Sequence, residues 1–476
     1  TVDGRDIATN IPASLGTAGQ VLSVNAGATA GEWADAGGGG STLEATASGA
    51  LANGDLVVVN SDGTVSVVSG GSGSEAAGTP TVFNSASTGE AAVGYDANAQ
   101  KIVAIYRDAP GRARVGTVSG TSISFGSEAT FETGSVNYLS ITYDSNAQKV
   151  VIAYNDGSDG DKGKAVVGTV SGTSISFGSI TTFNSAVTEG IAITYDENAQ
   201  KIVIAYADFG NSSYGTAIVG TVSGTSISFG TEVVFQSSSC NFMTATYDAN
   251  AQKVVIAYDR NTNGAAVVGT VSGTSISFGS ITQFNSSRAE KASITYDASA
   301  QKVVVAYPDA GNSEHGTAKV GTVSGTSISF GSAVVFESAR IARVSASYDA
   351  NAEKVVIAYQ DRDNSEYGTV VAGTVSGTSI SFTTPIVFES AAANKIKTAY
   401  DASAQKVIIT YQDEGNSSYG TAVAYQAEFN STNLTAENYI GISDGAYADA
   451  ATAAVQIVGS VDDAQSGLTA GQSYYV

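Results

Sequence analysis

Residues 116–125 read GTVSGTSISF, and the same ten residues recur five more times, beginning at Gly168, Gly220, Gly269, Gly321 and Gly373. A Tyr-Asp pair accompanies the repeat, with its tyrosine at positions 95, 143, 195, 247, 296, 348 and 400. A phenylalanine stands twelve residues before each of these tyrosines, from Phe83 to Phe388. This repeat length is typical of the four-stranded blades of a β-propeller. We therefore predict an all-β fold, a seven-bladed β-propeller with blades of about 51 residues.

The third unit illustrates the four strands that we expect in each blade. Residues 191–195 form the first strand and residues 201–206 the second, which is apolar almost throughout and suits a strand buried on both faces. Residues 216–222 form the third strand, and a tight Ser-Gly turn leads to the outer strand at residues 225–229. Apolar and polar residues alternate in this outer strand, as expected for a strand with one face in solvent.

The seventh unit lacks the outer hairpin, because residues 420–425 continue into Gln-Ala-Glu-Phe instead of SGTSISF. We expect the segment before the first blade, residues 77–83, to supply the missing outer strand and close the ring. Further strands are expected in the flanks, at residues 51–59, 64–68, 439–442, 453–458 and 473–476.

Both flanks are strand-rich and too small to be stable alone, so we expect them to form one small β-domain together. The predicted organisation places a short N-terminal stalk segment and Gly linker at residues 1–40. The small β-domain takes its first half from residues 41–75 and its second half from residues 430–476. The propeller, residues 76–429, is inserted between these two halves.

The composition excludes several classes of function. The chain of 476 residues has a formal net charge of −22, which repels phosphate backbones and anionic lipid, so no nucleic-acid binding is expected. A single cysteine, Cys240, excludes a disulfide framework, and a single histidine, His315, argues against a Ser-His-Asp triad. No apolar run approaches 18 residues, so no membrane insertion is expected. A chain that begins at Thr1 is expected to be part of a longer protein.

Short segments in the flanks resemble parts of tailed-bacteriophage proteins. Residues 15–22 (LGTAGQVL) and 31–35 (GEWAD) resemble segments of tail fibre proteins, especially those of marine phages, and residues 1–6 resemble another stretch of such fibres. Residues 437–443 and 461–471 resemble small β-domains of phage virion proteins. The propeller matches no characterised family. The resemblance implies a virion appendage that acts outside the cell, contacts other virion proteins and self-associates as a trimer through its flanks.

The repeats differ from one another mainly on one face of the predicted propeller. The turn after the first strand and the Ser-Gly-Thr-Ser turn stay almost constant. By contrast, the residue seven positions after each phenylalanine is Glu90, Tyr138, Gly190, Phe242, Lys291, Arg343 or Lys395. The residue before it is Gly89, Asn137, Glu189, Asn241, Glu290, Ala342 or Asn394. A constant scaffold with variable loops on one face is what a recognition surface requires, and drift of unselected loops after duplication is the alternative.

We therefore predict that this variable face binds a host receptor, a bacterial surface glycan or protein, without catalysis. Its aromatic side chains can stack on sugar rings, and its polar side chains can hydrogen-bond hydroxyls or pair with anionic groups. The predicted receptor-binding residues are Glu90, Asn137, Tyr138, Glu189, Asn241, Phe242, Glu290, Lys291, Arg343, Asn394 and Lys395.

Two other functions stay open. One is a structural capsid or tail decoration without a receptor. The other is an envelope-glycan hydrolase, which would use a carboxylate pair such as Glu189 and Glu290. Asp361 and Asp363 come nearest to a calcium site, but no loop completes the twelve-residue calcium-binding pattern. Such residues more often cap turns with their own side chains, so we predict no cofactor.

Overall fold

The computed structural model describes residues 20–24, 31–35, 42–68, 70–432, 439–443 and 445–456. The chain divides into two compact units, one made of Thr1–Ser72 with Asn430–Val476 and the other of Gly73–Phe429. The larger unit begins three residues before the expected start of the propeller, residue 76, and ends at the expected residue 429.

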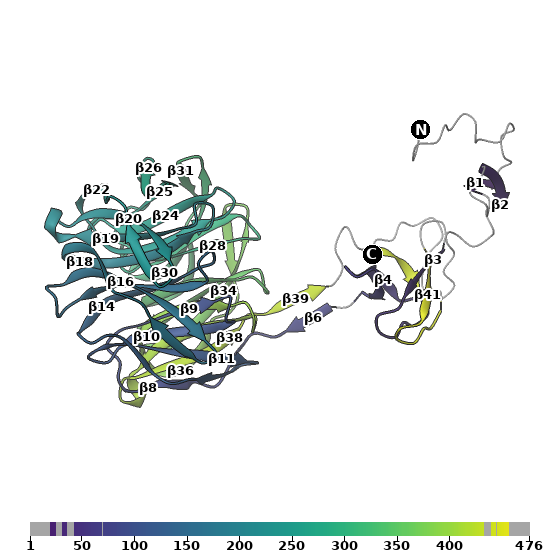
Figure 1. Cartoon of the computed structure of the whole chain (residues 1–476), viewed down its shortest axis with the longest axis horizontal. Coiled ribbons are helices and arrows are strands. Elements are labelled where there is room, and N and C mark those ends of the chain that lie inside the picture. The colour runs from purple at the N-terminus through teal and green to yellow at the C-terminus, as the bar shows by residue number, and fades with distance from the viewer. Residues whose placement is uncertain are drawn as a thin grey trace. The chain divides into compact units, whose positions relative to one another are not determined.

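The larger unit is a β-propeller, and seven blades are present in the described part of the chain (Figure 1). The first strands lie nearest the centre and are β9 (Ala91–Asp96), β14 (Val136–Asp144), β18 (Thr181–Asp196), β23 (Asn241–Asp248), β28 (Ser293–Asp297), β32 (Val334–Asp349) and β36 (Ile386–Asp401). The second strands are β10 (Lys101–Arg107), β15 (Lys149–Asp156), β19 (Lys201–Asp208), β24 (Lys253–Asp259), β29 (Lys302–Asp309), β33 (Lys354–Asp361) and β37 (Lys406–Asp413). The third strands are β11 (Gly111–Ser119), β16 (Lys162–Ser171), β20 (Tyr214–Ser223), β25 (Gly264–Ser272), β30 (His315–Ser324), β34 (Tyr367–Ser376) and β38 (Tyr419–Gln426). Within each blade these strands pair antiparallel in chain order, so the predicted fold class is confirmed.

The core lies between neighbouring blades, which explains the apolar second strands. In β19, Ile202 and Ile204 pack in one buried cluster with residues of the second blade. Val203 and Ala205, which point to the other side, pack in another cluster with residues of the fourth blade. Since both faces of a second strand meet a neighbouring blade, a polar residue on either face would be buried.

The outer edge of each blade contains the predicted outer strand and a second strand piece that was not predicted. The third strand β16 pairs along one edge with β17 (Ser174–Phe177) at one end, and with the beginning of β18 at the other. The outer strand therefore has two pieces, and the chain then crosses to become the first strand of the next blade. The first pieces are β12 (Ser122–Phe125), β17, β21 (Ser226–Phe229), β26 (Ser275–Phe278), β31 (Ser327–Phe330) and β35 (Ser379–Phe382). The separate second pieces are β13 (Ala129–Glu132), β22 (Val233–Ser239) and β27 (Thr282–Asn285).

Strands from the N-terminal side of the propeller complete the seventh blade, as predicted. β7 (Ala76–Ala77) and β8 (Thr81–Ser87) both pair with the third strand β38, in the places of the two outer pieces of the other blades. The Tyr425 hydroxyl donates to the carboxylate of Glu75 just before β7. Each first strand also contacts the next one, and β36 contacts β9, so the ring is closed.

A ring of tyrosines joins neighbouring blades at the C-terminal ends of the first strands. The Tyr143 hydroxyl accepts a hydrogen bond of 3.1 Å from the backbone N–H of Asn98 in the turn of the preceding blade. The other six tyrosines of the Tyr-Asp pairs make the same bond, and Tyr95 accepts from Ser403 across the closure. The repeated Tyr-Asp pair is thus a joint between blades. The buried aspartate caps the following turn, as Asp144 does by accepting from the Ala147 N–H at 2.8 Å.

A glycine follows five of the six SISF strands, and contact with the next blade requires it. A Cβ atom at Gly178 would lie 1.8 Å from the carbonyl oxygen of Thr225, in the Ser-Gly-Thr-Ser turn of the third blade. The sixth blade carries Thr383 at this position, because the seventh blade has no such turn. The Thr383 hydroxyl donates instead to Glu75, at 3.2 Å.

Gly178→Ala is therefore expected to lower the free energy of unfolding by about 1–3 kcal/mol, because a backbone atom of the next blade must move. Thr383→Ser is the matched control: it changes the equivalent position without the clash, keeps the hydroxyl that donates to Glu75 and accepts from the Ala372 N–H, and is expected to cost about 0.5 kcal/mol or less. Chemical denaturation followed by circular dichroism measures both. Equal losses would contradict the assigned contact.

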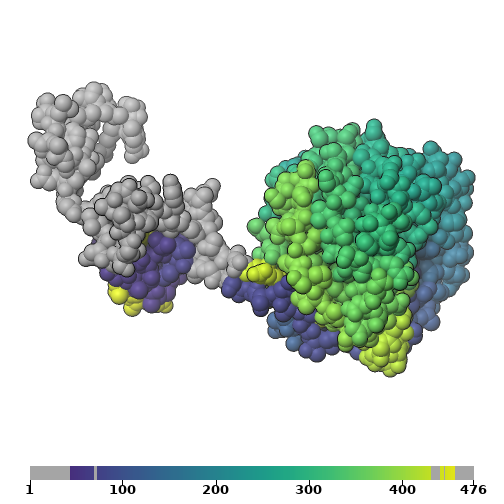
Figure 2. All heavy atoms as spheres, turned by 180° about the vertical axis from the view of Figure 1, so that it is seen from behind, coloured from purple at the N-terminus to yellow at the C-terminus, as the bar shows by residue number. Residues whose placement is uncertain are grey.

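The smaller unit contains a five-stranded sheet built from both flanks, as predicted. Atoms of the N-terminal flank (purple) and of the C-terminal flank (yellow) gather together in this unit (Figure 2). Its order is β3 (Thr42–Thr46), β41 (Thr452–Gln456), β40 (Tyr439–Ser443), β4 (Leu56–Val59) and β5 (Val65–Val67). β6 (Gly70–Gly73) pairs with β39 (Phe429–Thr432), and β1 (Gln20–Val24) pairs with β2 (Gly31–Asp35). Most of the predicted stalk, the Gly linker and the strand expected at residues 473–476 lie outside the described residues. No helix in the described ranges is long and apolar enough to cross a membrane.

Candidate functional site

The most variable position of the repeat has an unusual backbone conformation. On the first strands, the register shifts by one residue around Tyr138, Gly190, Phe242, Arg343 and Lys395. Each of these residues, and Lys291 at the same position, has a positive φ, between 50° and 59°. A bulge of this kind re-aims a side chain. A positive φ is uncommon for residues other than glycine, so this backbone conformation indicates that the surrounding structure stabilises it.

These six residues and Glu90, the seventh residue at the variable position, all line one central pocket. The pocket has a volume of about 410 Å³ and lies where the first strands begin. Six of the predicted receptor-binding residues line it: Glu90, Tyr138, Phe242, Lys291, Arg343 and Lys395. Gly190 is the seventh, and it stands between Tyr138 and Phe242 in the order of the blades. Since consecutive blades are neighbours, the order of these residues around the pocket follows their order in the sequence.

The five other predicted residues stand one position earlier and do not line the pocket. Asn241 donates to Asn261 at 2.9 Å, and Glu290 forms an ion pair of 2.7 Å with Arg288. Asn137 contacts Arg107 and Asn155, Asn394 accepts from Arg343 and Gln360, and Glu189 accepts from the hydroxyl of Tyr138. These residues point away from the pocket because successive residues of a strand point to opposite sides. Their contacts hold neighbouring side chains in place. The predicted carboxylate pair, Glu189 and Glu290, thus lies outside the lining.

Lys397 is a lining residue that our sequence interpretation missed. It follows Lys395 by two positions, so a strand period of two turns it toward the same centre. The equivalent residues in other blades, such as Ser140, Thr244 and Ser293, also line the pocket. The strand period applied beyond the variable position was the signal that could have identified it.

One side of the pocket is strongly cationic. Lys291, Arg343 and Lys395 come from three consecutive blades, the fifth to the seventh, and Lys397 lies beside them. Within the described residues, none of these four cations has a carboxylate oxygen within 4.0 Å. Glu90 is the one carboxylate among the described lining residues, and it accepts a hydrogen bond of 3.3 Å from the Leu139 N–H.

The three lysines are less basic than lysines in water. Burial lowers the pKa of Lys291 first, and the charges of Arg343 and Lys395 lower it further. Burial likewise lowers the pKa of Lys395 and of Lys397. Lys397 lines the same pocket and is exposed to water. Desolvated, mutually repelling cations indicate a site that a bound anion would stabilise.

The other side of the pocket is aromatic. Tyr138 and Phe242 come from the second and fourth blades, and Met243 beside Phe242 is 7% exposed. The Lys291 ammonium lies 5.5 Å from the centre of the Phe242 ring, which joins the aromatic side to the cationic side. Burial and the nearby charge of Glu189 raise the pKa of Tyr138, so its hydroxyl stays protonated. The pocket therefore offers an apolar wall, hydroxyl groups and an arc of positive charge.

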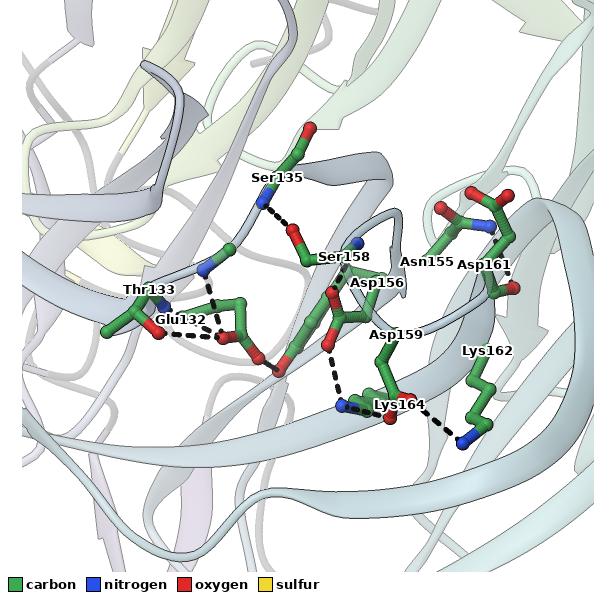
Figure 3. A network of polar contacts seen from close by, with 12 residues as sticks. Glu132, Thr133, Ser135, Asn155, Asp156, Ser158, Asp159, Asp161, Lys162 and Lys164 are labelled. Carbon is green, nitrogen blue, oxygen red and sulfur yellow. Dashed lines mark hydrogen bonds and ion pairs between the residues drawn. The ribbon is translucent and has the colours of Figure 1, made fainter.

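The charged loop between β15 and β16 is stabilised by its own ion pairs (Figure 3). The Lys164 ammonium lies 2.6 Å from Asp156 and 2.9 Å from Asp159. Asn155 donates to the carbonyl of Thr188 at 2.8 Å and so ties the second blade to the first strand of the third. None of the loop residues 157–161 lines the pocket.

The remaining candidate residues have structural partners. Asp361 accepts from the Asn364 N–H at 3.1 Å, and Asp363 pairs with Arg340 at 2.8 Å. Within the described ranges, no group of three or more His, Cys, Asp or Glu side chains is placed to hold a metal ion. Cys240 is buried, and burial raises the pKa of its thiol to about 12, so the thiolate is rare near neutral pH.

The aspartates of three other loops cap short 3-10 helices, as the turn-capping interpretation predicted. The helices are η1 (Phe209–Asn211), η2 (Ala310–Asn312) and η3 (Glu414–Asn416). Their caps are Asp208, Asp309 and Asp413, each of which accepts a backbone N–H. These carboxylates are therefore engaged in holding the loops.

No protein-family model matches the chain, and no curated protein matches it. The BP39L lectin from Burkholderia pseudomallei is similar in structure, with 12% identity and a TM-score of 0.53, over 72% of this chain and 97% of the lectin. An intramolecular trans-sialidase from Ruminococcus gnavus has 7% identity and a TM-score of 0.44, over 73% of this chain and 96% of its own. A leech intramolecular trans-sialidase has 7% identity and a TM-score of 0.42, over 74% and 69%. The likeness to the lectin concerns the fold alone, and the lower TM-scores of the trans-sialidases support no further comparison.

Proposed function

We propose that the protein is a carbohydrate-binding propeller whose central pocket binds a sugar of a bacterial cell surface. The observation that carries the proposal is that the seven most variable residues of near-identical repeats line one pocket of about 410 Å³. Pockets for small ligands commonly measure about 300–1,000 Å³ and combine apolar walls with a few polar groups. Diversity at this position in otherwise constant repeats is what a binding site for an asymmetric ligand needs.

The chemistry of the lining fits a sugar. Tyr138 and Phe242 offer aromatic faces against which the C–H faces of a pyranose can pack. Ser140, Thr244 and Ser293 also line the pocket. Each hydroxyl accepts a backbone N–H of the next blade and can still donate its own hydrogen to a ligand. The similar fold of a protein named a lectin supports the same proposal.

The proposed activity is binding without catalysis. Glycoside hydrolysis commonly uses two carboxylates that flank the bond, and Glu90 is the one carboxylate among the described residues of the lining. The proposed setting, an exposed appendage of a phage virion, is supported by the resemblance of the flanks. Trimeric self-association through the flanks stays a prediction, and light scattering coupled to size-exclusion chromatography tests it.

Binding of the labelled full chain to immobilised bacterial envelope polysaccharides tests the proposed function. A pocket variant changes Tyr138, Phe242, Lys291, Arg343 and Lys395 to Ser. It is expected to lose affinity by about 100-fold or more, because the central residues of a site carry most of the binding energy. The matched control changes five turn lysines to Ser, namely Lys101, Lys149, Lys201, Lys253 and Lys302, and is expected to bind like the wild type.

Retained binding by a folded pocket variant would place recognition elsewhere on the molecule. Binding by neither protein, across envelope polysaccharides from a broad panel of bacteria, would favour a structural decoration. Thermal melts of both variants establish that they are folded.

A further inference from the structure

The charge of the pocket is opposite to that of the chain. The whole chain carries a formal net charge of −22. Yet the pocket lining contains four cations, Lys291, Arg343, Lys395 and Lys397, and Glu90 as the carboxylate among its described residues. Concentrating cations at one place on an acidic protein requires a reason, because they repel one another and lose hydration.

We infer that the pocket binds an acidic sugar, a pyranose that carries a carboxylate, and holds that carboxylate on Lys291, Arg343 and Lys395. The inference rests on the proposed function and narrows its ligand class. Hydrogen bonds between these cations and a carboxylate are charge-assisted, and they are about twice as strong as bonds between neutral groups. They would also relieve the repulsion among cations that have no carboxylate within 4.0 Å in the described residues.

The order of the blades defines how the ligand lies. The cations stand on the fifth, sixth and seventh blades, and the aromatic side chains of Tyr138 and Phe242 on the second and fourth. A pyranose with its carboxylate toward the cations presents its ring to these aromatic side chains.

Glu90 favours a singly charged ligand. It stands on the first blade, next to Lys395 of the seventh, and its charge acts on both Lys395 and Lys397. A second negative charge on the ligand would be repelled by this carboxylate. A carboxylate with one charge therefore fits the site better than a phosphate dianion, and the carboxylate of Glu90 can accept hydrogen bonds from sugar hydroxyls.

Calorimetric titration of the full chain at pH 7 tests the inference. The probes are glucuronic acid, galacturonic acid and N-acetylneuraminic acid, each compared with its own methyl ester, which keeps the shape and removes the charge. At least one acid is expected to bind about tenfold or more tightly than its ester. Arg343→Gln and Lys395→Gln are each expected to reduce this preference to about threefold or less. Lys201→Gln, in a turn away from the pocket, is the control and is expected to keep the preference.

Equal binding of acid and ester overturns the inference and leaves the proposed function intact. Competition by inorganic phosphate at the same concentration as the acids also overturns it, because the pocket would then be a general anion site. Binding of neither form of any of the three sugars overturns it as well. The proposed function fails with it only if the envelope polysaccharides also fail to bind.

Discussion

A chain that begins at Thr88 is expected to have a free energy of unfolding lower by more than about 4 kcal/mol than one that begins at Gly73. The two chains differ only in residues 73–87, which contain both outer pieces of the seventh blade, β7 and β8. Phe83 in β8 is 1% exposed, and its ring lies 5.2 Å from that of Tyr106 in the first blade. Losing a buried phenylalanine side chain alone typically costs about 3–5 kcal/mol.

The chain that begins at Gly73 is the matched control, because it lacks the same part of the smaller unit and keeps the closure. Urea denaturation followed by circular dichroism gives both free energies. In the full chain, Phe83→Ala is expected to cost about 3–5 kcal/mol without any truncation. Equal midpoints for the two truncated chains would show that the pairing of β38 with β7 and β8 does not stabilise the ring.

Affinity for an acidic sugar is expected to fall by about tenfold or more as the pH rises from 7 toward 10.5, the ordinary pKa of lysine. Burial lowers the pKa of Lys291, Lys395 and Lys397 below that value. The charged form binds the anion, so affinity is complete below the lowered pKa and is lost as the pH rises through it. Arg343 stays charged throughout this range.

The charges that surround these lysines set the size of the effect. They come from Glu90, Arg107, Glu290 and Arg343, together with the lysines themselves. The double variant Lys291→Arg with Lys395→Arg is expected to flatten the pH profile, because arginine does not titrate here. The methyl ester of the same sugar is expected to show no such fall. A profile that is the same for acid and ester would contradict the role of the lysines.

The seven blades could be predicted from the sequence because the repeats carry the same turn residues, the same alternation of apolar and polar residues, and the same Tyr-Asp pair that connects neighbouring blades. The Tyr-Asp pair and the SISF strand recur with nearly constant spacing, and the seventh unit visibly lacks its hairpin. The second piece of the outer strand was not predicted, because it depends on how β18 passes from one blade to the next. The sequence also did not explain why Thr383 replaces the glycine of the other repeats. The explanation is that the seventh blade lacks the turn with which a side chain at this position would clash.

The candidate site was predicted in part. Variation among repeats identified Tyr138, Arg343 and the four other predicted lining residues as one set, because variation is visible without coordinates. The preceding residues, such as Asn137 and Glu290, varied too, and the sequence could not distinguish the two positions. The bulge separates them, since it turns the later residue to the centre and leaves the earlier one on the side of the loops.

Repeat length, strand alternation and turn residues are local properties, so they are readable from the chain and define the blades. The meeting of side chains from different blades is not a local property. Glu90 comes close to Lys395, which lies 305 positions later in the chain, only because the ring is closed. The acidic composition of the chain gives no indication of an anion-binding site. In the structure, however, Lys291, Arg343 and Lys395 of the last three blades lie next to one another along one side of the pocket. Their mutual repulsion and lost hydration arise from that convergence in space, and these are the properties from which the ligand class is inferred.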